Sequence, residues 1–212
     1  MSTELNQQTL RDEFNRIREE QDPVSLRAFL DDQNISDIAE WLDDETEVAT
    51  EIIASMSMHR AVSVFKILDL SLQKQVIREL LPSITANLLN ELPADDRTDF
   101  LEELPSNVVR ELIKLLEPEE RKITLSLLGY PENSIGRLMT PDYVYVYPHN
   151  TIEEVFATIR KYGKDSETIN VIYIINEKGE LIDDIRIRDI ILNEPNKRIS
   201  ELIDGRFIAL HP

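Results

Sequence analysis

The chain has 212 residues, with 41 acidic and 23 basic side chains and a formal net charge of −18. This charge disfavours binding to nucleic acid or to an anionic membrane, and it favours cations or basic proteins as partners. The absence of cysteine excludes disulfides and thiol chemistry, and no apolar run approaches the roughly 20 residues that span a bilayer, so we expect a soluble, intracellular chain.

Short amphipathic helices are expected from the start of the chain to about residue 80. Residues 1–20 are typical of a polar, loosely amphipathic helix, and apolar residues then recur at helical spacing. The further segments are Leu26–Leu30, Ile35–Leu42, Val48–Met56, Ala61–Leu68 and Leu72–Leu80. Because helices this short cannot bury their apolar stripes alone, we expect them to stack into a helical coil with one continuous core. We expect eight or nine helices before Gly129.

Prolines divide the next stretch, Leu80–Leu128, into units of similar length. Pro82, Pro93, Pro105 and Pro118 follow one another at intervals of 11, 12 and 13 residues. Proline fits the first turn of a helix, where its missing N–H is no loss. Each proline therefore predicts a helix start.

The unit that begins at Pro93 has an unusual distribution of charge. At about 100° per residue, five acids share one helix face about 120° wide: Asp95, Asp96, Asp99, Glu102 and Glu103. The opposite, apolar stripe consists of Phe100, Leu101 and Leu104. Like charges one turn apart repel, so the acidic face destabilises the helix unless a cation lies against it.

The pattern changes at Gly129. Val144–Tyr147 and Val171–Ile175 are rich in β-branched and aromatic residues and predict strands. Asn176–Gly179 predicts a hairpin turn in which Gly179 takes a positive φ, with Leu181–Ile187 as the returning strand. A helix is expected between the first two strands, from Ile152, another from Asp189, and a last strand over Phe207–Leu210.

Charge also separates the two parts of the chain. Residues 129–212 carry 14 acids and 10 bases, whereas residues 1–128 carry 27 acids and 13 bases. We infer two domains with different roles.

The three histidines belong to no ligand or base motif, and no phosphate loop, nucleophile elbow or zinc motif occurs. The chain is therefore not expected to be an enzyme.

The residues from Tyr130 onward resemble a known family. Gly136–Pro141 (GRLMTP), a short strand and a Thr-Ile-Glu-Glu helix start resemble the entry into a cystathionine-β-synthase (CBS) domain. Preceded by LNELPADDRTDFLEELP and followed by Asp165–Leu181, they resemble the cytosolic region of the MgtE family of magnesium transporters. The resemblance covers nearly the whole chain and is strongest from about residue 80 to 205.

The resemblance implies a regulatory module without chemistry of its own. Members of this family are homodimers with an N-terminal helical domain, two CBS domains, a connecting helix and a membrane pore. Magnesium bridges acidic groups of the helical domain and the CBS region and favours the closed pore. This chain has no membrane segment and ends at the start of a second CBS domain. We therefore expect a truncated piece of a protein that lies on the cytoplasmic face of the cell membrane, and the alternative is a stand-alone soluble relative.

By motif position, the resemblance places Mg²⁺ contacts at Asp95, Asp96 and Asp99. Mg²⁺ prefers oxygen ligands and keeps several waters, so sparse carboxylates from two domains suit a sensor of low affinity. The alternative is that Asp95 and Asp96 only favour a helix start through its dipole. Glu102 and Glu103 are assigned to a solvated face.

A nucleotide site of the CBS domain is the second candidate site. In CBS domains that bind adenine nucleotides, a hydroxyl residue and an aspartate hold the ribose. Asp189 stands at the aspartate position, with Arg188 as a phosphate contact, but Arg186 replaces the hydroxyl and Asp183 stands where glycine is expected. The alternative is that Asp189 caps its helix.

We therefore predict a mainly α chain with an α+β second domain: a superhelical stack of short helices over residues 1–128, a linker over 129–143, and a first CBS domain over 144–212. The predicted function is magnesium sensing for a magnesium channel or transporter. Two other functions stay open: a protein-interaction scaffold, because similar stacked helices occur in the flagellar motor switch protein, and a CBS regulator that senses adenine nucleotides.

Overall fold

The computed structural model describes residues 2–131, 134–164, 166 and 168–210. The chain forms two compact units. One contains the residues up to Leu92 together with Asp96–Thr124, and the other contains Pro93–Asp95 together with the residues from Leu125 onward.

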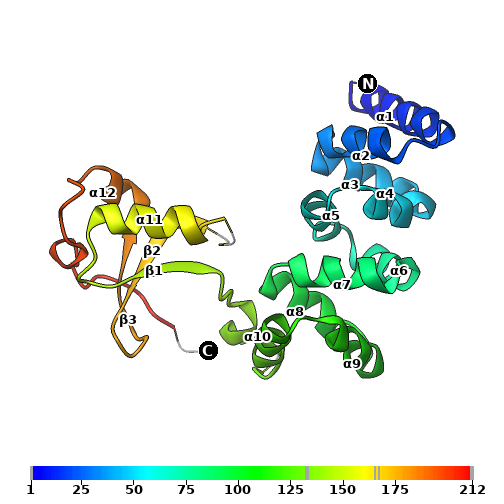
Figure 1. Cartoon of the computed structure of the whole chain (residues 1–212). Coiled ribbons are helices and arrows are strands. Elements are labelled where there is room, and N and C mark those ends of the chain that lie inside the picture. The colour runs from blue at the N-terminus through cyan, green and yellow to red at the C-terminus, as the bar shows by residue number, and fades with distance from the viewer. Residues whose placement is uncertain (1, 132–133, 165, 167, 211–212) are drawn as a thin grey trace. The chain divides into compact units, whose positions relative to one another are not determined.

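The first unit is a stack of short helices (Figure 1). In the described part of the chain, ten α-helices begin before Gly129, rather than eight or nine: α1 (Ser2–Glu19), α2 (Pro23–Asp32), α3 (Ile35–Asp44), α4 (Ala49–Ser55), α5 (Met58–Phe65), α6 (Leu70–Glu79), α7 (Pro82–Glu91), α8 (Ala94–Glu102), α9 (Ser106–Leu115) and α10 (Pro118–Leu128). A 3₁₀ turn, η1 (Thr46–Val48), precedes α4.

The prolines mark helix starts as predicted. Helices α7 and α10 begin at Pro82 and Pro118, and α8 and α9 begin one residue after Pro93 and Pro105. The proline ring fixes the φ angle that a helix start needs. Each proline therefore separates one helix from the next.

One core runs through the stack. Its cluster of buried apolar side chains extends from Leu10 in α1 to Leu116 after α9. Within it, the rings of Phe65 in α5 and Phe100 in α8 meet edge to face with centroids 5.5 Å apart. The continuous core expected from the apolar spacing is confirmed for α1 to α9, which bury their apolar stripes against one another.

A charged side chain lies inside this unit, on the buried side of α8. Arg97 is fully buried, and its guanidinium donates hydrogen bonds to the carbonyls of Leu89 (3.0 Å) and Leu92 (3.2 Å) at the end of α7. It also donates to Thr124 Oγ1 at 2.8 Å and pairs with Glu120, both on α10. Arg97 therefore connects α8 to the preceding helix, α7, and to α10.

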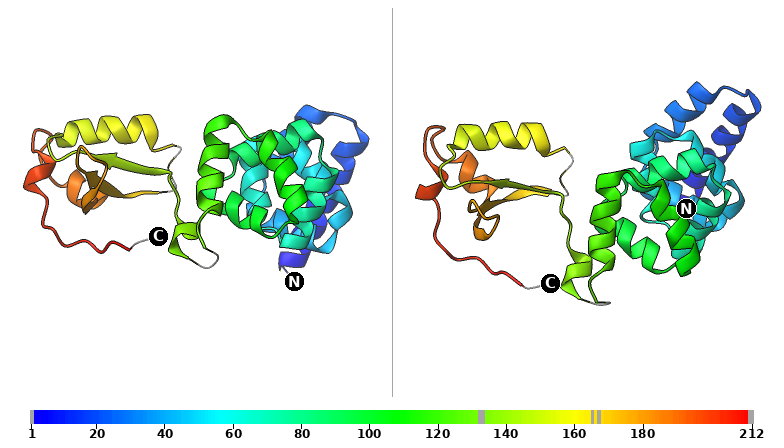
Figure 2. Two further views of the ribbon diagram at one scale, coloured as in Figure 1. Left: turned by 90° about the horizontal axis from the view of Figure 1, so that it is seen from below. Right: turned by 60° about the horizontal axis from the view of Figure 1, so that its bottom comes forward.

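The second unit is a three-stranded sheet packed against helices on one face (Figures 1 and 2). Strand β1 pairs in parallel with β2, and β2 pairs antiparallel with β3. The described elements are η2 (Ile135–Leu138), β1 (Tyr143–Val146), α11 (Ile152–Tyr162), β2 (Thr168–Ile175), β3 (Leu181–Arg186), α12 (Ile187–Ile191) and η3 (Ile199–Glu201).

The core of this unit lies between the sheet and its helices. Val144, Val146 and Ile172 project from the sheet toward this core, which also contains Ile152 of α11 and Ile190 of α12. Along β1 the buried valines alternate with the exposed Tyr143 and Tyr145. The opposite face of the sheet therefore carries aromatic side chains.

Several predicted boundaries were inexact in this unit. Strand β2 begins at Thr168, three residues before the predicted start, because pairing with β1 extends the ladder. Helix α12 begins at Ile187, which was predicted to end the strand. Residues 207–210 have no regular secondary structure, and the predicted strand there is wrong because no ladder partner lies alongside them among the described strands.

At two glycines a side chain would cause either backbone strain or a steric clash. Gly179 has φ +79° in the turn between β2 and β3, and its N–H donates to the Asn176 carbonyl at 2.9 Å, as predicted for the hairpin. At Gly136, before the LMTP segment, an added Cβ would collide with the Tyr130 ring. Close packing with Tyr130 therefore explains the glycine of this motif.

The aspartate that replaces an expected glycine in β3 is buried. The Asp183 carboxylate accepts hydrogen bonds from the backbone N–H groups of Asp204 (2.8 Å), Gly205 (3.0 Å) and Asp184 (3.0 Å). Gly205 has φ +69° in this turn. Asp183 thus anchors the segment that follows η3 to the sheet.

We predict that Arg97→Met lowers the free energy of unfolding of the first unit by about 2–4 kcal/mol, since the carbonyls of α7 lose a buried donor. Urea unfolding followed by the fluorescence of Trp41, which lies in this unit, measures the change. Arg110→Met, at an exposed position of α9, is the control and should stay within about 0.5 kcal/mol of the wild type. Equal losses in both variants would contradict the anchoring role of Arg97.

We predict that Asp183→Ala exposes the turn at Asp204 and Gly205 and lowers the stability of the second unit by about 1–3 kcal/mol, because three N–H groups lose their acceptor. Hydrogen exchange at these two amides is the direct measurement, with faster exchange expected in the variant. In the control Asp184→Ala, which changes an exposed neighbour, exchange at both amides should match the wild type. Unchanged protection in Asp183→Ala would show that the carboxylate does not hold the turn.

Candidate functional site

The three predicted metal contacts lie on α8 as the sequence pattern indicated. Asp95 and Asp96 are the second and third residues of this helix and are half-buried, and Asp99, one turn further on, is exposed. Glu102 and Glu103 are exposed. The acids at Asp95 and Asp96 also lie where the helix dipole favours negative charge.

A lysine from an earlier helix lies against this acidic face. Lys66 Nζ is 3.2 Å from Asp96 Oδ2, although the two residues are 30 positions apart in the chain. Both side chains are about one-third exposed. The ion pair neutralises part of the acidic face, and the helical pattern of α8 alone contains no signal for it.

Asp95 has a carboxylate oxygen that suits a cation. Its Oδ1 atom is buried and has no hydrogen-bond partner among the described residues. A buried carboxylate oxygen without a partner is costly, and a bound cation would relieve that cost. The oxygen donors of Asp95, Asp96 and Asp99 fit the preference of Mg²⁺ for carboxylate ligands.

The described part of the chain does not assemble a complete metal site. No group of three or more acidic or histidine side chains within it is arranged to hold a metal ion. Mg²⁺ keeps several of its waters and is often held by one or two carboxylates. The α8 acids therefore fit a partial site that needs ligands from elsewhere.

Sequence reasoning missed Arg97, the residue that fixes how α8 presents these acids. At about 100° per residue, Arg97 lies about 200° from Asp95, in the middle of the apolar stripe. A basic residue at the centre of an apolar stripe was the available signal, because such a charge must find acceptors in the core. With Arg97 held in the core, the acids lie on the opposite side of α8.

The predicted nucleotide contacts lie at the other end of the chain. Arg188 and Asp189 are exposed residues of α12. The residue that caps α12 is Arg186 and not Asp189, which lies within the first turn. Asp189 as the helix cap is therefore wrong, and its carboxylate remains available to a ligand.

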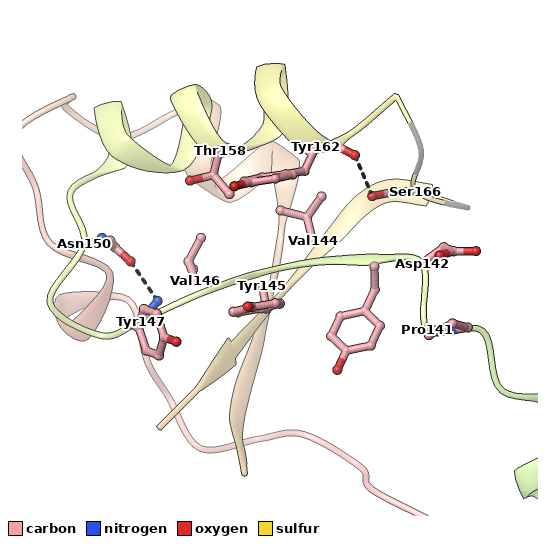
Figure 3. A pocket seen from close by; sticks show the side chains of 11 residues that line it. Pro141, Asp142, Val144, Tyr145, Val146, Tyr147, Asn150, Thr158, Tyr162 and Ser166 are labelled. Carbon is pink, nitrogen blue, oxygen red and sulfur yellow. Dashed lines mark hydrogen bonds between the residues drawn. The ribbon is translucent and has the colours of Figure 1, made fainter. Parts of the chain in front are cut away.

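A separate hollow of about 530 Å³ lies along β1 and beneath α11. Figure 3 shows Thr158 and Tyr162 of α11 on one side of it and Val144 and Val146 of β1 on the other. Asn150 Oδ1 accepts a hydrogen bond from the Tyr147 N–H at 2.8 Å and shapes its end. The hollow contains neither the α8 acids nor Arg188 and Asp189, so it is distinct from both predicted sites.

The histidines take no part in either site in the described structure. The ring of His149 stacks on Tyr147, with centroids 5.4 Å apart and planes 5° from parallel. His211 lies outside the described residues.

Within the described ranges, no helix has the length and apolar character to cross a membrane.

Two families match the chain, one for each part. Residues 9–133 match the MgtE intracellular N domain, and residues 135–194 match the CBS domain. The first match covers more than half of the chain. Neither family is a family of enzymes.

Two curated relatives are magnesium transporters. The magnesium transporter MgtE of Bacillus subtilis is 31% identical over 121 residues, which cover 57% of this chain and 27% of the relative. The magnesium transporter MgtE of Thermus thermophilus is 37% identical over 118 residues, which cover 54% of this chain and 26% of the relative. The matched region thus spans about a quarter of the length of these relatives.

Solved structures agree with this assignment. The cytosolic domain of the Mg²⁺ channel MgtE in complex with ATP superposes with a TM-score of 0.84 at 30% identity, covering 92% of this chain and 80% of that chain. The soluble part of a magnesium transporter superposes with a TM-score of 0.86 at 20% identity, over 98% of this chain and 80% of that one, and supports the fold. The chain belongs to the MgtE family, with an MgtE intracellular N domain followed by a CBS domain.

Proposed function

We propose that this chain is the magnesium-sensing regulatory part of a magnesium channel or transporter, and that it acts on the cytoplasmic face of the membrane. In this proposal, Mg²⁺ bound between the α8 acids and acids from other parts of the full-length protein favours the closed state. Full-length homodimers, a second CBS domain and a transmembrane domain complete the proposed assembly. The observation that carries the proposal is the acidic face of α8, with Asp95, Asp96 and Asp99, in a chain of this family.

The charge of the helical part supports a sensor of cations. Its excess of acids over bases is 14, whereas that of the remaining chain is 4. Acids on one face repel one another when no cation is present, and a divalent cation removes that repulsion. The equilibrium between arrangements of the domains would then depend on the concentration of Mg²⁺, because the cation binds one arrangement more tightly.

The buried Oδ1 atom of Asp95 supports the same proposal at the level of one atom. It lacks a partner among the described residues, although most buried polar atoms are hydrogen-bonded. A ligand set of few carboxylates and several waters implies weak binding. Weak binding suits a sensor, because the site fills only when Mg²⁺ is plentiful.

Calorimetric titration of the chain with MgCl₂ tests the role of the α8 acids. We predict a weak, saturable heat for the wild type and a loss of affinity of about tenfold or more for Asp95→Asn/Asp96→Asn/Asp99→Asn, which removes ligands and three charges.

The control for this titration removes the same charge elsewhere in the helical unit. Asp32→Asn/Glu40→Gln/Asp43→Asn changes three exposed acids of α2 and α3 and should bind Mg²⁺ as the wild type does. If the two triple variants respond alike, the effect is one of net charge, and the α8 acids are not specific contacts.

Binding of an adenine nucleotide by the CBS domain is a second candidate function. A structure that is 30% identical over 92% of this chain is the complex of an MgtE cytosolic domain with ATP. In this chain, Arg188 and Asp189 supply an exposed guanidinium and an exposed carboxylate on one turn of α12. A guanidinium suits phosphate, and a carboxylate accepts hydrogen bonds from ribose hydroxyls.

We predict that ATP binds the wild type and that Arg188→Ala/Asp189→Ala weakens binding about tenfold or more, because the charge-assisted hydrogen bonds are lost. Calorimetry with ATP measures the change. Glu153→Ala/Arg160→Ala, which removes one acid and one base from exposed positions of α11, should leave the affinity unchanged. Wild-type affinity in the α12 variant would exclude these two residues.

A further inference from the structure

A small hollow lies where the α8 acids face the earlier helices α5 and α6. Its volume is about 300 Å³. The rings of Phe65 and Phe100 line it together with the charged side chains of Asp96, Asp99, Glu103 and Lys66. One ammonium therefore shares this hollow with three carboxylates.

The backbone places Lys66 firmly at the edge of the hollow. Lys66 is the residue that caps the C-terminal end of α5, and its N–H donates to the Val62 carbonyl at 3.1 Å. The ring of Phe65, the preceding residue, is buried against Phe100 of α8. The start of the lysine side chain is thus fixed relative to α8, whereas its four methylene groups leave the ammonium able to move.

The ammonium occupies a position that a metal cation would also favour. Lys66 Nζ lies 3.2 Å from Asp96 Oδ2, and both side chains are about one-third exposed. Water and dissolved ions therefore reach the pair, and an ion pair of this exposure is weak enough to open. Three carboxylates facing one ammonium leave a net negative charge that still attracts cations.

We propose that Lys66 is a built-in counter-cation that Mg²⁺ displaces from Asp96, and that it thereby sets the affinity of the α8 acids for divalent cations. This inference rests on the proposed magnesium-sensing function. Binding of Mg²⁺ breaks the Lys66–Asp96 ion pair and moves the ammonium into water, which opposes binding. Lys66 lowers the affinity so that the acids fill only at high Mg²⁺ concentrations.

A purely structural role for Lys66 makes different predictions. A cation at the C-terminal end of α5 stabilises that helix through its dipole, and such a role would affect thermal stability but not the affinity for Mg²⁺. Replacing Lys66 by arginine keeps the charge at the same place. Replacing it by methionine removes the charge and keeps a flexible apolar side chain of similar length.

Calorimetric titration of the chain with MgCl₂ at constant ionic strength separates these roles. For Lys66→Met we expect a Kd for Mg²⁺ about three- to tenfold lower than that of the wild type, since the competing charge is gone. For Lys66→Arg we expect a Kd within about twofold of the wild type, because the competing charge remains. A Kd for Lys66→Met that is unchanged or higher would overturn the inference.

Lys114→Met is the matched control. Lys114 Nζ forms an ion pair with Glu111 at 2.7 Å on the exposed surface of α9, so this variant loses the same charge and one ion pair away from the hollow. Its Kd for Mg²⁺ should equal that of the wild type. A gain in affinity equal to that of Lys66→Met would show a general effect of charge and would also overturn the inference.

A measurement on the unmodified chain keeps the inference testable if Lys66→Met does not fold. In NMR spectra of the lysine side chains, added Mg²⁺ should shift the Cε and Nζ signals of Lys66 and leave those of Lys114 in place. Binding of Mg²⁺ without a shift at Lys66 would overturn the displacement of its ammonium. The absence of any Mg²⁺ binding by the wild type would instead refute the proposed function itself, so the two failures are distinguishable.

Discussion

The buried guanidinium of Arg97 is the constraint on which the placement of α8 depends. A charge withdrawn from water is tolerated when its N–H groups find acceptors, and Arg97 finds them at the end of α7 and on α10. These acceptors define the rotation of α8 about its axis. Because Asp95 lies about 200° away from Arg97, it cannot turn toward the same acceptors.

Burial of this charge has a cost that an apolar residue would avoid. A buried ion pair is weak evidence for stability, because desolvation offsets much of the Coulomb attraction. What Arg97 provides is a defined orientation, since its planar guanidinium donates in fixed directions to its carbonyl and hydroxyl partners. A leucine there would leave the rotation of the helix to side-chain packing alone.

Local chemistry explains which features could be predicted from the sequence. Pro82 and Pro118 start helices through their own φ angles, and Gly179 takes a positive φ in a hairpin turn. The features that escaped prediction depend on partners distant in sequence, as with Arg97 and Thr124 or Lys66 and Asp96. The helical pattern placed the three α8 acids on one face, but it could not show that one of them already has a cationic partner.

The buried carboxylate of Asp183 has a mechanical consequence for the second unit. Three backbone N–H groups converge on it, and two of them belong to the turn after η3. A force on residues 206–210 therefore acts on β3 through these hydrogen bonds, as well as on the backbone that precedes the turn. Helix α12 follows β3 directly, so the strand that bears part of this load is also the strand that leads into Arg188 and Asp189.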